Sequence, residues 1–598
     1  MCGIIGYVGD TSPISVVATG LKNLEYRGYD SAGVALNDGA IEVYKQQGEI
    51  DDLQLPESTD AKLGIGHTRW STHGEPTDEN AHPHTDCEGR IAVVHNGIIE
   101  NYDSLQDELS DHEFTSETDT EVIPHLLEEV YVGDDLVGAV QAVLDRLEGS
   151  YAFAVTAVGH DGMVAARMDS PLVVGHGEDG NFLASDVTAF LEHTRKVSYV
   201  EDGDVVSATA DGITVYGDEG VVDRAVRTVD WEAEAAEKGG YDHYMLKEIH
   251  EQPRSLRQTL SGRVDAVGGD VDLELDMPEQ YLQSVEEVQV VACGTSYHAG
   301  LYAQQLIEEL ADVRVSVKVA SEYEFTGGRD PWRTLVVAVT QSGETADTLS
   351  AMREAARAGA RTMAVTNTVG STAAREADDA IYIRAGPEIG VAATKTFAAQ
   401  VTTLSLLSVY LGRERGMLSA DDASELLENA RGLPGAIQQI LDVEDEIREV
   451  AEEYVDGEAF FFVGRKLGCP VALEGALKLK EISYAHAEGF AAGELKHGTL
   501  ALVTPNTPVL AVLTEGANPK ATLNNVKEVE SRGAPVVGIS SYEGAEKFLD
   551  ATFDVPELGR LEPLLANVYL QLFAYHVAKI MGRSIDKPRN LAKSVTVE

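Results

Sequence analysis

The stretch VQVVACGTSYHAGLYAQQLIEEL, residues 288–310, decides the fold of the second half of the chain. It joins an apolar, β-branched run to a helical pattern through the loop Gly294-Thr295-Ser296. A strand that leads through a small-residue loop into a helix is typical of α/β domains with a parallel sheet. The same unit recurs as AFFFVGRKLGCPVALEGALKLKEI at residues 459–482. We therefore expect two such domains in tandem.

The repeat extends beyond this first unit. TLVVAVTQSGETADTLSAMREAARAGARTMAVTN, residues 334–367, is paralleled by PVLAVLTEGANPKATLNNVKEVESRGAPVVGISS, residues 508–541. The spacing predicts two doubly wound domains, at residues 280–430 and 445–585. Residues 586–598 form a C-terminal tail, which we expect to be docked because it contains no low-complexity run.

The first 235 residues follow a different pattern. Short alternating strands such as CGIIGYVG, SAGVALND and RIAVVHNGII are separated by Gly and Asp or Asn. Two helices are expected near residues 120–130 and 134–148. This indicates an α+β domain of packed sheets with helices at residues 1–235. The charged segment 236–279 is interpreted as a linker.

Composition excludes several classes of partner. The chain carries 46 Lys and Arg against 100 Asp and Glu, a formal charge of −54 that is spread along its whole length. Such a surface repels nucleic acid and anionic membranes, and it suits a very salty cytoplasm where screening is strong. The first twenty residues lack the basic region of a signal peptide, and the apolar stretch 396–412 is too short and Thr-rich to span a bilayer. We expect a soluble, cytoplasmic protein.

Cys2 is one of four widely separated cysteines, which form no C-x-x-C pair and predict no disulfide framework. If Met1 is removed, the α-amine of Cys2 lies beside its own thiol. An α-amine has a pKa of about 7.7–8.0, so it can act as general base for that thiol. The alternative is a terminal cysteine kept as a small hydrophobic residue.

Other segments of the first half supply partners for a nucleophile. Asn96 and Gly97 in VVHNGIIENY would make an oxyanion hole, although HNG alone is also compatible with a type I′ hairpin turn. Asp119 in SETDTEV could hold an amine. The loop GHTRWSTHGEPTDENAHPH contributes further polar candidates, namely Arg69, Trp70, Thr72 and His73.

A metal site is the competing interpretation of that loop. His67, His73, His82, His84 and Cys87 are crowded within residues 67–87. No pair has the spacing of a zinc finger or of the H-E-x-x-H helix. We therefore predict loop histidines and no metal in this segment.

Two strand-to-helix loops of the second half are candidates for phosphate binding. They contain Ser296 in ACGTSYHAG and Gln341, Ser342 and Thr345 in VTQSGETADT. Hydroxyls and N–H groups at a helix start bind anions without a basic side chain, and the alternative is ordinary N-capping. Neither loop is a Walker or G-x-G-x-x-G motif, which disfavours a nucleotide. The second repeat has TEGANPK in this place and has lost the phosphate loop.

The second repeat carries charged residues instead. Lys478, Glu481 and Ala485 lie near one face of a predicted helix at i, i+3 and i+7, and the alternative is a set of surface ion pairs. Glu474, Lys478 and Glu481 stand among Gly and Ala, which suits a helix that lines a cleft. His497 could move protons near neutral pH. Lys593 could form a Schiff base if desolvated, but otherwise it is a tail lysine.

Five separated motifs of the first half together resemble the class II glutamine amidotransferase domain, an N-terminal-nucleophile hydrolase. They are Cys2, YRGYDSAG, GHTRWSTHG, HNGIIEN and SETDTE. The resemblance implies that Cys2 attacks the side-chain amide of glutamine while Arg69 and Asp119 hold its α-carboxylate and α-amine. It also implies that Asn96 and Gly97 hold the oxyanion. Trp70 would close the site, in the loop that also carries Thr72 and His73.

The second half resembles paired sugar-isomerase (SIS) domains, and the motifs CGTS, SGET, EIGVAATK, ALKLKEIS, GELKHG and KPRNLAKSVTVE extend the similarity over the full length. The whole chain is similar to the glutamine:fructose-6-phosphate amidotransferase family. The resemblance implies that Ser296, Gln341, Ser342 and Thr345 bind the sugar phosphate. Further implied roles are an imine on Lys593, proton transfer between C1 and C2 by Glu481, ring opening by His497 of a neighbouring subunit, and assistance by Lys478. Ala393 stands where the family often has Ser, so Val391 and Ala393 are expected to contribute backbone groups.

The expected activity is therefore the transfer of ammonia from glutamine to fructose 6-phosphate with isomerisation to glucosamine 6-phosphate, in a homodimer. An imine and a carboxylate suffice for this chemistry, so no metal or organic cofactor is predicted. A phosphoribosylpyrophosphate-type amidotransferase should carry an acidic D-D-S loop, which the sequence lacks. A sugar-phosphate sensor without activity should have lost Cys2, Glu481 or Lys593, and all three are present.

Overall fold

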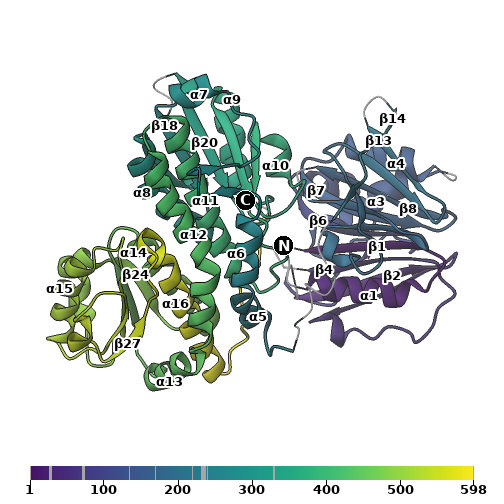
Figure 1. Cartoon of the computed structure of the whole chain (residues 1–598). Helices are drawn as coiled ribbons and strands as arrows, with labels where there is room; N and C mark the ends of the chain where they lie inside the picture. The colour runs from purple at the N-terminus through teal and green to yellow at the C-terminus, as the bar shows by residue number, and fades with distance from the viewer. Residues whose placement is uncertain are drawn as a thin grey trace. The chain divides into compact units, whose positions relative to one another are not determined.

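The computed structural model describes residues 2–25, 28, 30–69, 75–132, 135–168, 170–217, 220–229, 238, 240–326 and 330–596. The chain divides into two compact units (Figure 1). The first contains Met1–Glu237 together with the C-terminal segment Ala592–Glu598, and the second contains Lys238–Leu591.

Two antiparallel sheets form the first unit. The eight-stranded sheet has the order β15 (Arg227–Thr228), β11 (Lys196–Tyr199), β9 (Val173–His176), β10 (Gly180–Ala184), β1 (Gly3–Gly9), β4 (Leu63–Arg69), β2 (Ser31–Asn37) and β3 (Ile41–Gln47). The seven-stranded sheet has the order β14 (Gly220–Val222), β13 (Ile213–Gly217), β12 (Val205–Thr209), β8 (Gly162–Met168), β7 (Gly149–Ala157), β6 (Ile91–Ile99) and β5 (His84–Thr85).

Side chains of β1 show how the layers are stacked. Ile4 and Val8 point into the core shared by the two sheets, whereas Ile5 and Tyr7 point into the core beneath helix α1 (Pro13–Leu24). This period of two is expected for a strand that is covered on both faces. The other sheet is covered by the helices α2 (Tyr102–Glu108), α3 (Val122–Val130) and α4 (Leu136–Leu144). The predicted α+β architecture of packed sheets and helices is confirmed.

Helix α1 rests almost directly on the backbone of β4. A Cβ atom at Gly66 would lie 2.6 Å from Val17 Cγ1 and 2.9 Å from Leu21 Cδ1, so only glycine permits this approach. The close packing fixes β4, whose last residue is Arg69.

The second unit contains two parallel sheets with the same strand order. The first runs β19 (Arg314–Val319), β18 (Glu287–Ala292), β20 (Thr334–Val339), β21 (Arg361–Thr366), β22 (Asp379–Tyr382). The second runs β24 (Ala487–Ala491), β23 (Phe460–Gly464), β25 (Val509–Leu513), β26 (Val536–Ser540), β27 (Ala551–Asp554). In each, the chain order reverses between the first and third strands, which is where doubly wound sheets bind ligands. The predicted tandem α/β folds are confirmed.

The second unit has one large and two smaller hydrophobic cores, which are lined by its helices. These helices are α5 (Tyr244–His250), α6 (Gln252–Leu260), α7 (Glu279–Ser284), α8 (Gly294–Ala311), α9 (Ala346–Ala358), α10 (Thr372–Glu376), α11 (Lys395–Glu414), α12 (Ala420–Leu441), α13 (Glu444–Tyr454), α14 (Gly468–Ser483), α15 (Pro519–Glu530) and α16 (Glu562–Ile580). The short hairpin β16 (Val264–Asp265) and β17 (Asp270–Val271) follows α6.

Two of these helices come from the segment interpreted as a linker. Met245, Ile249 and Leu256 of α5 and α6 are fully buried in the large core, so this segment is an integral part of the second unit. Among the described residues, no helix combines the length and apolar character that crossing a bilayer requires.

Candidate functional site

The position of Cys2 is set by the pairing of β1 with β4. Gly3 pairs with Thr68, so the chain enters the sheet with Cys2 beside Arg69. The thiol is partly buried and forms no disulfide. A strand buried on both faces therefore holds Cys2 at a fixed place at the start of the fold.

Arg69 is surrounded by negative groups. Its side chain is buried, which lowers the pKa of the guanidinium, and the charges of Cys2, Asp119 and Asp30 oppose that effect. These groups come from three separate segments of the chain. The structure thus places Cys2 and Asp119 near enough to Arg69 for their charges to act on it.

Asn96 is aimed at Cys2 by a neighbouring histidine. Its Nδ2 donates to the backbone oxygen of Cys2 at 3.0 Å. His67 Nε2 lies 3.1 Å from Asn96 Oδ1 and 2.9 Å from the backbone oxygen of His95. Both of these atoms are acceptors, so Nε2 carries the proton. Burial and Arg69 lower the pKa of His67 to about 3, which keeps the imidazole neutral.

This role of His67 was missed by the sequence analysis, which considered it only as a possible metal ligand. Its partner Asn96 lies on a strand of the other sheet, so no local pattern links the two residues. His67 fixes the orientation of the Asn96 amide: Oδ1 faces His67, so Nδ2 faces Cys2.

Gly97 lies inside β6 and pairs with Tyr151 of β7, so the alternative of a hairpin turn at HNG is wrong. Its φ is 131°, and a Cβ atom there would lie 2.0 Å from the backbone oxygen of Ser150. Only glycine fits this backbone. The strand continues through Gly97 because β7 supplies a complete antiparallel partner.

Asp119 begins the short 3₁₀ helix Asp119–Glu121 that leads into α3. Its buried carboxylate accepts a hydrogen bond of 2.7 Å from the backbone N–H of Ile99, at the end of β6. The acid is thereby fixed to the strand that carries Asn96 and Gly97. Trp70, Thr72 and His73 lie outside the described residues.

In the second unit, the predicted phosphate-binding residues lie at the switch point of the first parallel sheet. Ser296 is in the first turn of α8, after β18, and its hydroxyl accepts a hydrogen bond of 2.9 Å from Gln400 Nε2. Gln341, Ser342 and Thr345 follow β20. The backbone oxygen of Gln341 accepts from the N–H of Asn367 at 3.1 Å.

The shape of the β20 loop depends on Gly343. Its φ is 72°, and a Cβ atom there would lie 2.1 Å from Ser371 Oγ. The Thr345 hydroxyl lies 2.9 Å from Thr340 Oγ1. The alternative of ordinary N-capping fails here: in the described structure, the N-cap residues Cys293 of α8 and Thr345 of α9 do not cap these helices with their side chains.

Helix α14 of the second domain presents a buried ionic cluster to the first domain. Glu474 and Lys478 are 0% exposed. Lys478 Nζ lies 2.5 Å from Glu481 Oε2 and 3.4 Å from Glu474 Oε1. The alternative of surface ion pairs is therefore wrong. Because Lys478 holds Glu481 directly, it orients the predicted proton-transfer carboxylate.

Side chains of α8 complete this cluster. Thr295 Oγ1 donates to Glu474 Oε1 at 3.0 Å and accepts from Lys478 Nζ at 3.2 Å. His298 Nδ1 lies 2.8 Å from Glu474 Oε2. Sequence reasoning placed Thr295 only in the loop before this helix and did not name His298, although the two residues are spaced i, i+3 on one face of α8.

The cluster keeps Lys478 and Glu474 charged. Burial opposes the charge of Lys478, but Glu474 and Glu481 raise the pKa of its ammonium above the ordinary value. Burial likewise opposes ionisation of Glu474, yet Lys478, His298 and Thr295 hold the pKa of this carboxyl below its usual value.

Ala485 does not belong to this helix face. Helix α14 ends at Ser483, and Tyr484 takes a left-handed conformation with φ of 64°. The expected i+7 position is therefore wrong, because the chain leaves the helix before reaching it.

The segment that holds Val391 and Ala393 is fixed by other parts of the second unit. The N–H of Val391 donates to the backbone oxygen of Asp586 at 3.1 Å, and the N–H of Gly390 donates to Glu248 Oε1 at 3.2 Å. Asp586 in turn accepts from the backbone N–H groups of Tyr244 and Met245. The start of the C-terminal tail is thus docked on this segment.

Two predicted residues lie outside α14. His497 is exposed at the end of the 3₁₀ helix Ala492–His497. Lys593 lies in the segment Ala592–Glu598, which belongs with the first unit. Their roles stay predictions.

Comparisons with known proteins agree with this division. Residues 67–192 match the glutamine amidotransferase domain family, and residues 281–410 and 455–581 match the SIS domain family. The chain is 62% identical to glutamine–fructose-6-phosphate aminotransferase (isomerizing) of Halobacterium salinarum, with both chains covered completely. It is 48% identical to the enzyme of the same name from Methanosarcina mazei, again over 100% of both chains. The C-terminal domain of glucosamine-fructose-6-phosphate aminotransferase from Francisella tularensis has 36% identity and a TM-score of 0.55, covering 59% of this chain and 99% of that one.

Proposed function

Because the chain belongs to the family of isomerizing glutamine–fructose-6-phosphate aminotransferases, we propose that it transfers ammonia from the amide of glutamine to fructose 6-phosphate and forms glucosamine 6-phosphate and glutamate. This is the first step of hexosamine biosynthesis. The observation that carries the proposal is the identity of 62% over the complete length of both chains, which includes both halves of the chemistry.

The first unit supplies the glutaminase chemistry. After removal of Met1, the α-amine of Cys2 takes the proton of its thiol, and the thiolate attacks the amide carbon of glutamine. Asn96 Nδ2, already directed at Cys2, and the backbone of Gly97 stabilise the oxyanion. An amide NH₂ has two hydrogens, so the bond to the Cys2 carbonyl leaves one for this purpose.

Substrate recognition in this unit follows from charge. Arg69 would bind the α-carboxylate of glutamine, and the buried Asp119 would bind its α-amine. Trp70, Thr72 and His73 are proposed to line the same site. Ammonia leaves the tetrahedral intermediate, and water then releases glutamate from the Cys2 thioester.

The second unit supplies sugar binding and isomerisation. Ser296, Gln341, Ser342 and Thr345 would bind the phosphate at the switch point of the first parallel sheet, supported by backbone groups of Val391 and Ala393. N–H groups and hydroxyls suit a phosphate in a chain of net charge −54, because they attract it locally without a basic side chain.

Proton transfer is assigned to α14. Lys593 would form the imine with the open-chain ketose, His497 of a neighbouring subunit would open the ring, and Glu481 would move the proton between C1 and C2. The 2.5 Å contact with Lys478 supports the assignment of Glu481, because a fixed carboxylate transfers protons along a defined path. We propose a cytoplasmic homodimer, since His497 is exposed and a neighbouring subunit could use it.

Product analysis with two nitrogen donors tests the proposal. Wild-type protein should form glucosamine 6-phosphate from fructose 6-phosphate with either glutamine or ammonium. Cys2→Ala should abolish glutamine-dependent synthesis and retain the ammonium-dependent reaction. Cys469→Ala is the matched control and should retain both, because Cys469 lies in the first turn of α14, outside the proposed chemistry. Unchanged glutamine use by Cys2→Ala, or activity of a protein whose mass shows a retained Met1, would contradict the glutaminase assignment.

A further inference from the structure

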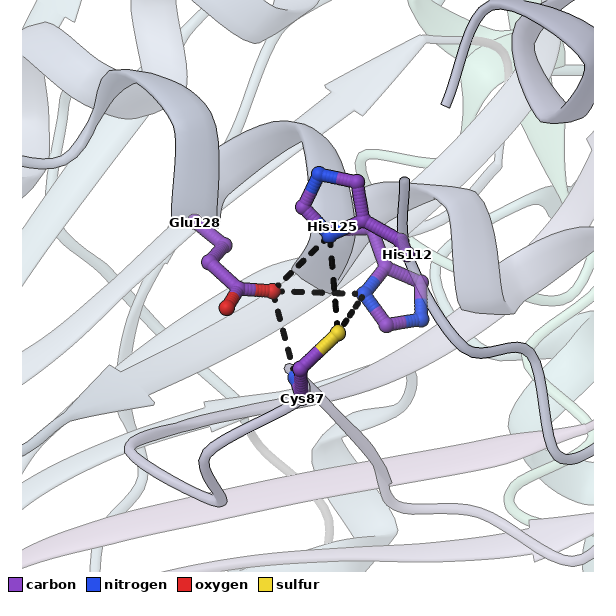
Figure 2. Close-up of side chains that lie close together, drawn as sticks. All are labelled: Cys87, His112, His125 and Glu128. Carbon is purple, nitrogen blue, oxygen red and sulfur yellow. Dashed lines mark hydrogen bonds and ion pairs between the residues drawn. The ribbon is translucent and has the colours of Figure 1, made fainter. Parts of the chain in front are cut away.

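Four side chains of the first unit converge beside α3 (Figure 2). Cys87 lies in the turn between β5 and β6, and His112 follows α2. His125 and Glu128 stand one turn apart on α3. One potential ligand atom from each residue lies within 4.8 Å of all the others, and this is the only such group of His, Cys, Asp or Glu found among the described residues.

Four of the six separations within this cluster are close to the edges of a tetrahedron around one metal ion. Cys87 Sγ lies 3.5 Å from His112 Nδ1 and 3.6 Å from His125 Nδ1. Glu128 Oε2 lies 3.0 Å from His112 Nδ1 and 3.4 Å from His125 Nδ1. Zinc bonds of about 2.3 Å to sulfur and about 2.0–2.1 Å to nitrogen or oxygen, at tetrahedral angles, give edges of about 3.5 Å and about 3.3 Å.

The outer nitrogen of each histidine faces a carboxylate. His125 Nε2 lies 3.9 Å from Glu121 Oε1, and His112 Nε2 lies 3.8 Å from Glu129 Oε1. A carboxylate on this side favours the tautomer with the proton on Nε2, which leaves Nδ1 as the lone-pair donor toward the cluster. Metal-binding histidines characteristically donate this N–H to a carboxylate, and here each carboxylate lies within ion-pair distance, just beyond a hydrogen bond.

Glu121 and the ring of His125 are each held in place by further contacts. Glu121 accepts hydrogen bonds from the backbone N–H and hydroxyl groups of Thr115 and Ser116, at 2.7–2.8 Å. The ring of Phe114 packs edge-on against His125, with ring centroids 4.7 Å apart. The His125 side chain is 1% exposed, so its orientation is determined by the fold.

Cys87 is exposed, whereas the His112 and Glu128 side chains are 13% and 17% exposed. An ion can therefore enter from solvent at the cysteine, while the remaining ligands are anchored. The histidines that surround Cys87 in sequence do not join it: His67 and His82 stack at 4.1 Å, and His82 packs against His84 at 4.7 Å.

We propose that Cys87, His112, His125 and Glu128 bind one zinc ion. One thiolate, two imidazoles and one carboxylate form a complete tetrahedral set of the donors that zinc prefers. With all four positions filled by protein, the site is structural: it joins the turn after β5, the segment after α2 and helix α3. Since α3 continues directly from Asp119–Glu121, the ion would also fix the position of Asp119.

Metal content and cobalt spectroscopy of the full-length protein test this proposal. Protein equilibrated with zinc chloride under reducing conditions, then freed of excess metal, should retain about one zinc per chain by mass spectrometry. Cobalt substitution should give the intense visible bands of a tetrahedral ion and a near-ultraviolet thiolate band. A high concentration of magnesium in all buffers removes weak binding to the acidic surface.

Variants assign the ligands. Cys87→Ser should remove the thiolate band and weaken zinc binding by roughly tenfold or more. Cys469→Ser is the matched control and should match wild type. If Cys87→Ser does not fold, the wild type still decides the matter: chelation should lower its melting temperature and added zinc should restore it. Absence of retained zinc in the wild type, an octahedral cobalt spectrum without a thiolate band, or wild-type affinity in Cys87→Ser would overturn the proposal.

Discussion

The two parallel-sheet domains of the second unit share one strand order but differ in the loop after their third strand. In the first domain this loop follows β20 and carries Ser342 and Thr345. In the second it follows β25, and a carboxylate of the protein occupies it. Glu562 Oε2, 1% exposed, accepts the N–H of Glu515 at 2.8 Å and the hydroxyl of Ser541 at 2.5 Å.

The helices that follow these two loops also differ in how their N-termini are capped. Helix α15 of the second domain is capped by Asn518, whose side chain accepts from the N–H of Ala521. The N-cap residue of α9 in the first domain is Thr345, which does not cap its helix and instead contacts Thr340. The second domain thus uses a carboxylate and an asparagine cap at this place, whereas in the first domain hydroxyls accept the N–H groups of Gly343 and Glu344.

The acidity around the second loop strengthens this contrast. A cavity of about 560 Å³ there is lined by four glutamates, Glu425, Glu515, Glu557 and Glu562. A phosphate would be repelled by this field. The comparison teaches that a duplicated domain can keep its fold while a buried carboxylate replaces the ligand. Under the function proposed above, the second domain would contribute chemistry through α14 in place of phosphate binding.

The largest expected effect is on kcat and comes from removing the proposed proton-transfer group, Glu481. Glu481→Gln cannot accept a proton, so kcat for glucosamine 6-phosphate formation should fall by roughly 10²–10⁴-fold. The KM for fructose 6-phosphate should change little, because we assign phosphate binding to the first domain. Steady-state kinetics with ammonium as donor measures both values.

The exposed Glu488 of β24 provides the control, and Glu488→Gln should behave as wild type. A large rise in KM for Glu481→Gln with kcat retained would instead assign binding to the second domain, and the comparison would fail.

The next effect concerns stability. Lys478→Met leaves Glu474 buried without its ammonium partner, and we expect a loss of about 3–5 kcal/mol in the free energy of unfolding. Denaturant titration measures it. Lys480→Met changes an exposed lysine of the same helix and should cost far less. Equal losses in both variants would show that the buried ion pairs of Lys478 contribute no more to stability than an exposed lysine does.

The sequence predicted the parallel-sheet domains well because strands buried on both faces are continuous apolar runs, and the repeat supplied a second copy of each. It did not predict α1, where Ile14, Val16, Val17 and Gly20 weaken helix propensity. Tertiary packing of Val17 and Leu21 against Gly66 stabilises this helix, and such contacts leave no local signal.

The candidate sites were predictable only where a motif is local. Cys2, Asn96 and Asp119 stand in recognisable motifs, but the hydrogen bond from His67 to Asn96 crosses between sheets. Of the proposed metal ligands, only His125 and Glu128 are close in sequence. The end of α14 was also unpredictable, because a left-handed Tyr484 replaces the glycine that usually marks such an end.

An effect of intermediate size is expected when one serine is substituted in each of the two domains. Ser342→Ala should raise the KM for fructose 6-phosphate roughly 10- to 100-fold, the equivalent of about 1.5–3 kcal/mol for a hydrogen bond to a charged group. Ser541→Ala should leave this KM unchanged and lower only the melting temperature, since its partner is Glu562. If both variants raise KM alike, Ser541, which follows β26, also contacts substrate.

The smallest effect is expected at the carboxylate that replaces the ligand. Glu562 Oε1 accepts from the N–H groups of Leu558 and Gly559 at 3.2 and 3.1 Å, while Oε2 serves Glu515 and Ser541. In Glu562→Gln an NH₂ group replaces one of the two carboxylate oxygens. The two groups that donated hydrogen bonds to that oxygen then lose their acceptor. The loss should be about 1–3 kcal/mol in the free energy of unfolding, with kcat and KM unchanged.

Glu557→Gln is the matched control for this variant, because it removes an exposed charge from the same cavity without breaking these hydrogen bonds. It should leave the unfolding free energy within error of wild type. A Glu562→Gln protein that is as stable as this control would mean that the carboxylate does not hold the loop. A raised KM in Glu562→Gln would mean that the two domains have not separated binding from chemistry.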